Sequence, residues 1–586
     1  MRLLPFPFAP AASAQRQEGH RDNQTTPSTE QLIAKLDAAA AAMQKEQHIP
    51  GLAVIVVEKG KTRIKLGYGF ANVEAKRKVD PDSTIFRIGS ISKAVTLLAV
   101  SRLIDQGRIQ ASQPVREFGV PIQNPYDFAE PVTVNHLLTH TSGFDQIGVG
   151  RQVLDFDQSL STRKSRRPSL RQFLSAGNLR LVSRPGSMIR YDTYGTTLAG
   201  VILESVTKQS FREALRKELF APLGMNHSFV EVDESHLDAM ATGYRWLENE
   251  FEPRPYEIYM TTPASSIDAT PADMGRLLEA LTADGSNASG RLFSPEMNAT
   301  VLAPQFRAHP ELVGTTHGLF ESTTAQEGNT SINLRTVGHG GTMDGFRSAM
   351  TIIPERNLGV FLVANRSPDS RADSVDFRPL LDVVIESLDN APEKKAFNIP
   401  ETPKIDLAEY AGPYYYGVFC HTATSQDLSR DAWRRPQATE VTVQEGRLKI
   451  RDEMYLPRGE DVFVEASGRR LVYFGRDESG TVSHFVYSTS SDTFERELPA
   501  RPHSKVTSFA QRVFELATQS GPKQALEFAR YNADSPKFYV HEQEMNRAGY
   551  LLMEEDRLNV AIELFKLNVL RFPESWNAFD SLGEAY

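Results

Sequence analysis

The sequence predicts an α+β fold that is followed by a small all-β domain and a helical segment. Strand-like runs stand near the start and the end of the first 390 residues, and helical patterns lie between them. Short alternating apolar runs separated by turns recur from about 407 to 498, and helical periodicity governs the C-terminal part. A chain of 586 residues exceeds one ordinary domain. We therefore expect a main domain over 29–390, a β-barrel or sandwich over 401–500, and helices over 504–586.

The first 28 residues read as a leader or a disordered tail. Residues 1–14 carry one basic residue, a short apolar stretch and an Ala-x-Ala end, and a polar stretch follows. This pattern resembles a clipped signal peptide, so we expect a periplasmic or secreted protein, with a cytoplasmic one as the alternative. No other stretch approaches the length of about 20 apolar residues that crosses a membrane, so we expect no transmembrane segment.

Each element of the main domain follows from a local pattern. Apolar spacing and turn residues predict helices over 29–47, 94–104, 197–206 and 377–388, and strands over 52–57, 62–70, 346–353 and 358–364. The last two strands are joined by the turn 354–357 and predict a hairpin at a sheet edge.

A serine and a lysine, Ser90 and Lys93, stand one helical turn apart where the turn and strand of 83–88 meet a buried helix. A serine hydroxyl needs a neighbour that accepts its proton, and a lysine at i+3 shares its helix face. Backbone N–H groups at the start of a helix favour the anion that forms on an attacked carbonyl. This pattern is typical of a serine acyl enzyme.

The Ser-x-x-Lys tetrad decides little alone, because Ser161, Ser205 and Ser520 begin three further matches. Context separates them. Tyr191 follows a Pro-Gly turn and precedes a helix, and a phenol beside an ammonium can shuttle a proton. The later stretch Gly338-His339-Gly340-Gly341-Thr342 lets a substrate backbone approach a strand edge closely.

The ordered set Ser90-x-x-Lys93, Tyr191-x-Thr193 and His339-x-Gly341 resembles the serine β-lactamase and penicillin-binding protein superfamily. More narrowly, it is similar to the branch of class C β-lactamases, D-alanyl-D-alanine carboxypeptidases and esterases. The stretches 136–143 and 221–225 are similar to that branch too, and the resemblance covers roughly 30–390. It implies a mainly antiparallel sheet flanked by helices plus a helical subdomain, with the serine in the cleft between them.

The resemblance also implies roles for the motif residues. Ser90 would be the acylated nucleophile, Lys93 its proton acceptor, and Tyr191 the general base and acid. Backbone N–H groups of Ser90 and Thr342 would form the oxyanion hole. The substrate-binding residues that it implies are Thr193, His339, Gly340 and Gly341.

Two positions depart from the commonest pattern of this superfamily. Thr193 stands where an asparagine is usual, and its hydroxyl is shorter than an amide that both donates and accepts. His339 replaces a lysine, so a carboxylate anchor there would be weaker and pH dependent, or the imidazole would only support the network. Both changes favour an esterase or a peptidase over a dedicated β-lactamase.

The leading hypothesis is a serine hydrolase that acts on a small ester, an amide or a D-amino-acid peptide. An acyltransferase that uses the same residues is one alternative, and a noncatalytic penicillin-binding-like scaffold is another. The net charge of −9 and the absence of long basic blocks argue against nucleic acid as a partner. The natural substrate stays open.

Several weaker patterns receive structural interpretations. His136 and His140 lack a metalloprotease pattern and are assigned to hydrogen bonding, so no metal is expected. No cofactor is expected either, because Ile55 occupies the glycine position that a phosphate loop ending at residues 60–62 would need. Asp344 and Arg347 are interpreted as an exposed ion pair, with lining of the pocket as the alternative.

The C-terminal helices fit a 34-residue tetratricopeptide pattern. Gly549, Leu552, Ala561 and Phe565 occupy its small and apolar positions, and a second period stops inside its first helix. Because such repeats need neighbours to bury their apolar faces, we expect either a fragment or a segment that docks on the enzyme or on a protein partner. With Cys420 as the single cysteine, stability must come from packing rather than an internal disulfide.

Overall fold

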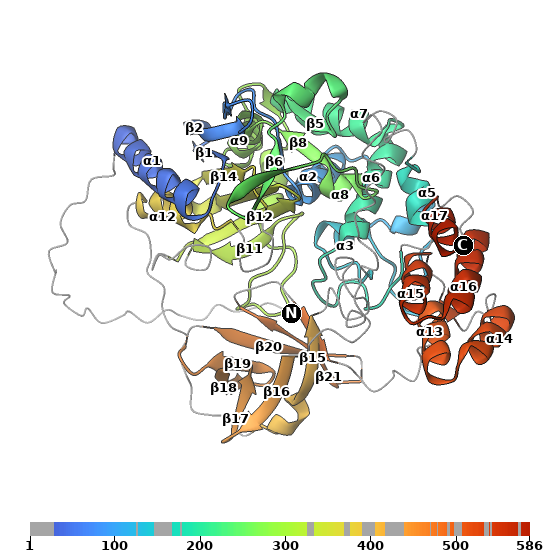
Figure 1. Cartoon of the computed structure of the whole chain (residues 1–586). Coiled ribbons are helices and arrows are strands. Elements are labelled where there is room, and N and C mark those ends of the chain that lie inside the picture. Colours follow the sequence, from blue (N-terminus) through green and yellow to red (C-terminus); the bar gives the residue numbers. More distant parts are fainter. Residues whose placement is uncertain are drawn as a thin grey trace.

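The computed structural model (Figure 1) describes most of the chain. The described residues are 28–124, 127–145, 167–175, 179–324, 333–367, 375–388, 405–416, 439–468, 470–477, 479–488, 493–496, 507–532, 538–539, 542–571 and 576–586. The predicted leader, the Ser161 tetrad and Cys420 lie outside them.

The main domain is built on a seven-stranded sheet in the order β11-β12-β13-β14-β1-β2-β3, and its pairs are antiparallel. The strands are β1 (Gly51–Glu58), β2 (Lys61–Asn72), β3 (Arg77–Lys78), β11 (Phe320–Thr323), β12 (Arg335–Met343), β13 (Phe346–Ile353) and β14 (Leu358–Ala364). The hairpin was therefore predicted with the correct residues but at the wrong position in the sheet. Its second strand pairs with β1, so the hairpin lies inside the sheet rather than at its edge.

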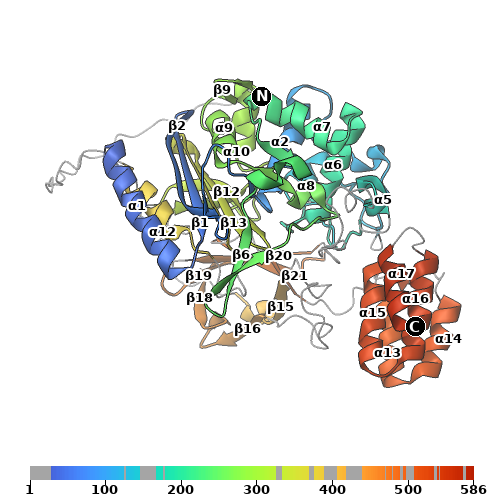
Figure 2. The ribbon, with the colours of Figure 1, turned by 45° about the horizontal axis from the view of Figure 1, so that its top comes forward.

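Helices cover both faces of this sheet, as Figures 1 and 2 show. On one face, α1 (Thr29–Glu46) and α12 (Arg378–Glu386) bury an apolar stripe against the strands. A capping box between Ser28 and Gln31 begins α1. On the other face lies α2 (Ile91–Asp105), of which 12 of 15 residues are buried. A helix that is buried on all sides must pack against other elements on all sides, and the helical part of the domain provides these contacts.

The helical part consists mainly of short elements between the early and late strands. Its helices are α3 (Val134–Leu138), α5 (Leu170–Ser175), α6 (Thr193–Thr207), α7 (Phe211–Leu215), α8 (Thr262–Ser265), α9 (Pro271–Leu281) and α10 (Pro295–Leu302). The accompanying short strands are β4 (Phe86–Arg87), β5 (Ser228–Val230), β6 (Gly243–Leu247), β7 (Glu250–Arg254), β8 (Ile267–Ala269), β9 (Ser286–Asn287) and β10 (Gly290–Arg291). Most of these helices, together with β4, β5 and β8, share one apolar core with the inner face of the sheet.

The all-β domain is a closed eight-stranded barrel in which β15 pairs with both β16 and β22. Its strands are β15 (Gly412–Tyr416), β16 (Thr439–Gln444), β17 (Arg447–Ile450), β18 (Glu453–Gly459), β19 (Val462–Glu465), β20 (Leu471–Arg476), β21 (Val482–Tyr487) and β22 (Thr493–Arg496). The aromatic rings of Tyr410, Tyr414, Phe474 and Phe485 pack inside it. The sequence left a barrel and a sandwich open as alternatives, and the structure shows the barrel.

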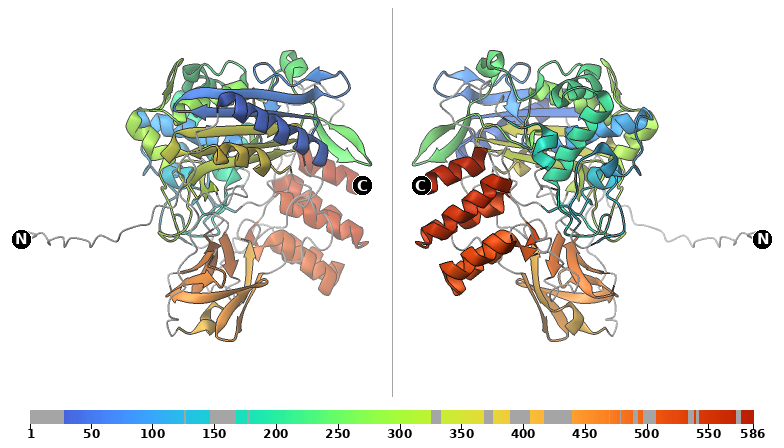
Figure 3. Two further views of the ribbon diagram at one scale, coloured as in Figure 1. Left: turned by 90° about the vertical axis from the view of Figure 1, so that its left-hand side faces the viewer. Right: turned by 90° about the vertical axis from the view of Figure 1, so that its right-hand side faces the viewer.

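The barrel docks on the main domain through a small apolar cluster. Leu312 of the main domain is buried against three barrel residues, Val464, Leu471 and Val486. Beside them, Arg458 pairs with Glu311 at 2.9 Å. Figure 3 shows the barrel on one side of the main domain.

The C-terminal part consists of helices α13 (Phe509–Gln519), α14 (Pro522–Asn532), α15 (Glu542–Glu554), α16 (Leu558–Arg571) and α17 (Trp576–Ala585), with the short strands β23 (Thr507–Ser508) and β24 (Phe538–Tyr539). Gly549 lies directly under the ring of Phe565, where a Cβ atom would come within 2.3 Å of the ring. Leu552, Ala561 and Phe565 are buried in the core of this segment. The tetratricopeptide assignment itself stays a prediction.

None of the helices in the described part of the chain combines the length and the apolar character that a membrane span requires.

Candidate active site

Ser90 lies at the point where β4 turns into α2. Gly89 adopts a φ of +55°, and a Cβ atom at this position would lie 2.8 Å from the backbone nitrogen of Thr342. Glycine is therefore required both for the turn and for its close approach to β12. The Ser90 side chain makes no capping hydrogen bond to its own helix, although it occupies the N-cap position.

Lys93 is buried, and its ammonium group faces Ser90. The Nζ atom donates to Ser90 Oγ at 3.3 Å and to the carbonyl oxygen of Ala264 at 3.1 Å. The same Nζ atom lies over the Tyr191 ring, whose centroid is 4.7 Å away. Three separate segments thus fix one amine beside one hydroxyl.

Tyr191 belongs to a cluster of rings from four segments. Its ring lies 5.4 Å from that of His140 and 5.9 Å from those of Phe320 and His339. The residue after it, Asp192, fixes the position of the tyrosine. The Asp192 carboxylate accepts hydrogen bonds from the Gly195 N–H, which caps α6, and from Ser142 Oγ. Thr193 is buried in the first turn of α6.

The buried histidine of this cluster, His140, has its hydrogen bonding set by the backbone. Its Nδ1 accepts from the N–H of Asp192 at 3.1 Å, so the neutral ring carries its proton on Nε2. Burial, followed by the proximity of the His339 ring and of Lys93, lowers the pKa of His140 well below its ordinary value. The neighbouring His136 bonds the backbone N–H of Thr133. Both histidines therefore make hydrogen bonds.

The glycine-rich motif lies on β12 next to the Ser90 turn. A Cβ atom at Gly341 would lie 2.0 Å from the Ile88 carbonyl oxygen, so only glycine allows this strand and turn to touch. Ser348 Oγ on β13 donates to the same carbonyl at 2.8 Å. β11 pairs with β12 only as far as Gly338, so among the described residues the edge beyond it has no further strand partner.

His339 faces Tyr191 and Lys93 as an uncharged ring. Its Nδ1–H donates to the Gly340 carbonyl at 2.6 Å. Burial, reinforced by the charge of Lys93, lowers the pKa of His339 to about 3. At neutral pH the imidazole therefore lacks the charge of a lysine, and of the two roles open for His339 the neutral ring favours support of the network.

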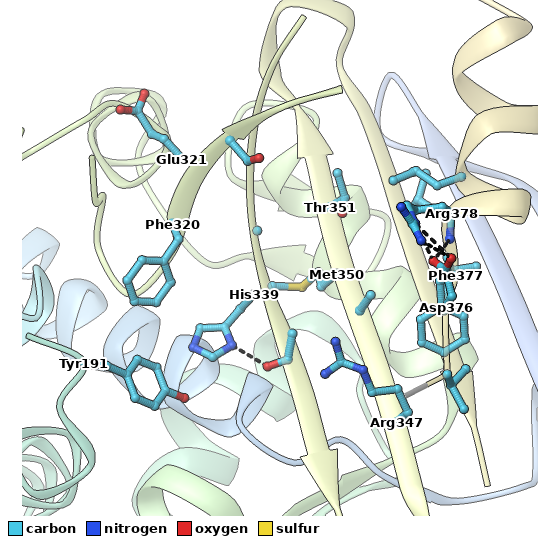
Figure 4. A pocket seen from close by; sticks show the side chains of 18 of the residues that line it. Tyr191, Phe320, Glu321, His339, Arg347, Met350, Thr351, Asp376, Phe377 and Arg378 are labelled. Atoms are coloured by element: carbon cyan, nitrogen blue, oxygen red, sulfur yellow. Dashed lines mark hydrogen bonds and ion pairs between the residues drawn. The ribbon is translucent and has the colours of Figure 1, made fainter. Parts of the chain in front are cut away.

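A cavity of about 560 Å³ opens beside Tyr191 and His339 and runs along β12 and β13 to the start of α12 (Figure 4). Arg347 lines it and donates to the Gly341 carbonyl at 3.2 Å and to Thr342 Oγ1 at 2.8 Å. The expected ion pair between Asp344 and Arg347 is wrong. The carboxylate of Asp344 instead binds Arg245 and Arg254 of the β6–β7 hairpin.

The competing tetrads differ from the Ser90 site. Ser205 Oγ accepts from Arg171, and Lys208 is the left-handed C-cap of α6. Ser520 lies in the loop between α13 and α14. Within the described ranges, no group of three or more His, Cys, Asp or Glu side chains is placed to hold a metal.

Some residues of the site had no signal in the sequence. Phe320 stacks on His140 with ring centroids 5.1 Å apart, yet it is one of 32 phenylalanines. The Ala264 carbonyl that holds Lys93 is a backbone group, which no residue type announces. Arg347 was singled out by its position just after the glycine motif; it lines the cavity, as the alternative interpretation expected, and does not form the expected ion pair with Asp344.

An antiparallel sheet with helices on both faces, and a Ser-x-x-Lys turn set against one of its strands, define a β-lactamase-like fold. The family model described as Beta-lactamase matches residues 36–384, which is more than half of the chain, and the chain belongs to this family.

Relatives and solved structures agree with this assignment. The chain is 24% identical to Protein flp of Staphylococcus aureus (strain MRSA252) over 320 residues, which are 54% of this chain and 60% of that protein. The chain thus spans well under two thirds of the length of this relative. A Beta-lactamase of Yersinia enterocolitica is 24% identical over 363 residues, covering 58% of this chain and 87% of that one. The crystal structure of SurE shares the fold, with a TM-score of 0.54 at 19% identity over 79% of this chain and 99% of that chain.

Proposed function

We propose that the protein is a serine hydrolase that forms an acyl enzyme on Ser90. The observation that carries this proposal is the position of Lys93 Nζ, 3.3 Å from Ser90 Oγ, with the Tyr191 ring against it. A buried amine held by a carbonyl on one side and by a hydroxyl on the other is suited to accept the hydroxyl proton when it is uncharged.

In the acylation step, Ser90 Oγ bonds to the substrate carbonyl carbon and gives its proton to Lys93 or Tyr191. The carbonyl oxygen becomes negative and accepts from the N–H groups of Ser90 and Thr342. The close approach of Gly89, the residue before Ser90, to Thr342 supports this role. The bond to the leaving group then breaks, and Tyr191 delivers the proton to the departing atom.

In the deacylation step, a water molecule attacks the acyl carbon and loses a proton to the same bases. The bond between the acyl carbon and Ser90 Oγ then breaks, and Oγ takes that proton back, which frees Ser90 as a hydroxyl. An alcohol or amine in place of that water would make the protein an acyltransferase, and the residues serve both reactions. Thr193 and the uncharged His339 favour a small ester, an amide or a D-amino-acid peptide as substrate, since the cationic lysine of many β-lactamases is missing.

Covalent labelling tests this proposal directly. Incubation with a fluorophosphonate should add one adduct to the full-length protein, which peptide mass spectrometry should place on Ser90. The Ser90→Ala variant should lose both this adduct and its turnover of p-nitrophenyl esters and D-alanyl peptides. Ester turnover that survives in this variant would refute the proposal.

The Ser205→Ala variant provides the matched control, because it removes a serine from an equivalent tetrad. It should keep the adduct and the ester turnover of the wild type. Absence of any adduct in the wild type would favour the noncatalytic scaffold instead.

A further inference from the structure

His140 stands at a backbone position that glycine occupies in many helices. It follows Thr139, the C-cap of α3, and adopts a φ of +55°. Helices commonly end on a residue in this left-handed conformation, which glycine and asparagine adopt more readily than residues with larger side chains. An observed backbone conformation of this kind is grounds to look for a function of the side chain that it carries.

His140 binds the peptide groups on both sides of Tyr191. Its carbonyl oxygen accepts from the N–H of Arg190 at 2.7 Å. Its ring Nδ1 accepts from the N–H of Asp192 at 3.1 Å, across a separation of 52 residues in the chain. One residue thus fixes the peptide segment that carries the tyrosine, from the residue before it to the residue after it.

The ring of His140 also packs against the ring of Tyr191. Their centroids are 5.4 Å apart, and their planes are inclined by 26°. Phe320 stacks on His140 at 5.1 Å with an angle of 13° between the planes, and it contacts Tyr191 as well. Because the peptide contacts and the ring contact belong to one residue, a change at His140 affects both the backbone and the phenol of Tyr191.

The His140 ring is an acceptor in this arrangement rather than an acid or a base. Its Nδ1 is occupied by the Asp192 N–H, and its buried Nε2 has no hydrogen-bond partner among the described residues. The hydrogen bonds of the Lys93 amine go to Ser90 and to the Ala264 carbonyl. The proton path from the serine to the amine therefore bypasses His140.

We propose that His140 is a positioning residue, which holds the Tyr191 phenol where it delivers a proton to the leaving group. The hydrogen bond from the Asp192 N–H to its Nδ1 is the side-chain contact that achieves this. The inference rests on the proposed acyl-enzyme function and adds a residue to the same site. A histidine that the sequence assigned to hydrogen bonding alone thereby acquires a function in the reaction.

The dependence on the leaving group separates a misplaced proton donor from a general loss of structure. A p-nitrophenyl ester releases a stable phenolate that needs no proton, whereas the ethyl ester of the same acid releases an alcohol oxygen that must be protonated. Both esters give the same acyl enzyme, so the ratio of their kcat/KM values reports on acylation. Measured within one protein, with the acyl group of highest turnover, this ratio does not depend on the amount of folded enzyme.

Two variants remove the acceptor of His140 in different ways. His140→Gly accepts the positive φ without strain and lacks the ring, and His140→Phe keeps a ring of similar size without an acceptor. In both variants the ratio of kcat/KM for the ethyl ester to that for the p-nitrophenyl ester should fall by about tenfold or more, a part of the 10²–10⁴ that a positioned proton donor contributes. Tyr191→Phe should lower the ratio at least as far.

His140→Asn is the rescue variant, because asparagine tolerates the left-handed backbone and carries Oδ1 at the place of Nδ1. It should restore a ratio close to that of the wild type. His136→Ala is the control. It removes a neighbouring histidine whose ring accepts from the N–H of Thr133 instead, and it should leave the ratio unchanged.

Failure of this inference is distinguishable from failure of the proposed function. A wild-type ratio in His140→Gly and His140→Phe, beside a lowered ratio in Tyr191→Phe, overturns the role of His140 and leaves the acyl-enzyme function standing. A ratio in His140→Asn as low as in His140→Gly overturns the role of the Asp192 hydrogen bond. An unchanged ratio in Tyr191→Phe overturns proton delivery by the tyrosine and this inference with it. A wild type without a fluorophosphonate adduct on Ser90 overturns the proposed function itself.

Discussion

Lys93 shows how much of the candidate chemistry depends on one amine. Its substitution by Met keeps an apolar stem of similar length and removes the proposed proton acceptor of Ser90. We expect kcat for the best ester to fall by about 10²–10⁴, the usual range for loss of a general base, with a much smaller change in KM. Steady-state kinetics and the rate of fluorophosphonate labelling measure this.

Lys208→Met is the control for this change, because Lys208 belongs to the tetrad of Ser205 and ends α6. It should leave labelling of Ser90 at the wild-type rate. A Lys93→Met protein that labels Ser90 as fast as the wild type would show that another group takes the serine proton.

A histidine behind the site, His317, makes stability depend on pH. It is buried beside Ser101 Oγ at 3.0 Å, and burial lowers its pKa to about 4. The unfolded chain binds this proton near pH 6.5, whereas the folded protein binds it only near pH 4, so stability falls as the pH drops through that window. From pH 7 to pH 5 the loss is about 2 kcal/mol by this linkage.

His317→Asn should remove this contribution and keep a donor near Ser101. We expect the melting temperature of the variant to fall less between pH 7 and pH 5 than that of the wild type, as thermal unfolding at both values would show. An equally steep fall in His317→Asn would mean that His317 is already charged in the folded protein.

At the scale of elements, the contact between the Gly89 turn and β12 sets the geometry of the proposed oxyanion hole. Gly89→Ala would place a Cβ atom 2.8 Å from the nitrogen of Thr342, in addition to the strain of a positive φ. The turn must then move away from β12, so the labelling rate of Ser90 and kcat should fall by about 10²-fold or more, as for loss of an oxyanion donor.

Gly107 provides a matched control. It also has a positive φ, of +69°, but a Cβ atom there meets nothing within 4 Å. Gly107→Ala should lose about 1 kcal/mol of stability through backbone strain and keep its activity, which denaturation and ester assays would measure. If both variants lose activity equally, the strain of the φ angle rather than the contact with Thr342 is responsible.

At the scale of the whole molecule, the contact of Leu312 with Val464, Leu471 and Val486 joins the barrel to the main domain. Burial, reinforced by the charge of Arg190, lowers the pKa of His484 on β21 to about 4. Because Arg190 directly precedes Tyr191 in the chain, this interaction places the barrel near the candidate active site. Leu312→Asp would bury a charge in this apolar contact, which is strongly unfavourable. We expect faster amide hydrogen exchange in β20 and β21 of this variant, measured by mass spectrometry.

Leu247→Asp is the control, because Leu247 is an exposed leucine of the β6–β7 hairpin. It should leave exchange in the barrel unchanged. Wild-type exchange rates in Leu312→Asp would show that this cluster does not hold the barrel.

Local sequence patterns predicted many of the helices and strands, and the predictions that failed did so for physical reasons. The ends of β13 and β14 follow from apolar runs and a turn, which are local signals. Their place inside the sheet depends on β1, about three hundred residues away, and no local pattern encodes that pairing.

By itself, the sequence determined the family-like motifs, the order of the three parts and the elements around Ser90, because turn residues and apolar periodicity act over short distances. Only the tertiary structure decided which side chains meet. It put Lys93 between Ser90 and the Ala264 carbonyl and stacked His140 against both Tyr191 and Phe320. Among the residues that the structure describes, it left Arg347 without a carboxylate partner. Such contacts join residues far apart in the chain, and burial then sets their charge, as the uncharged His339 illustrates.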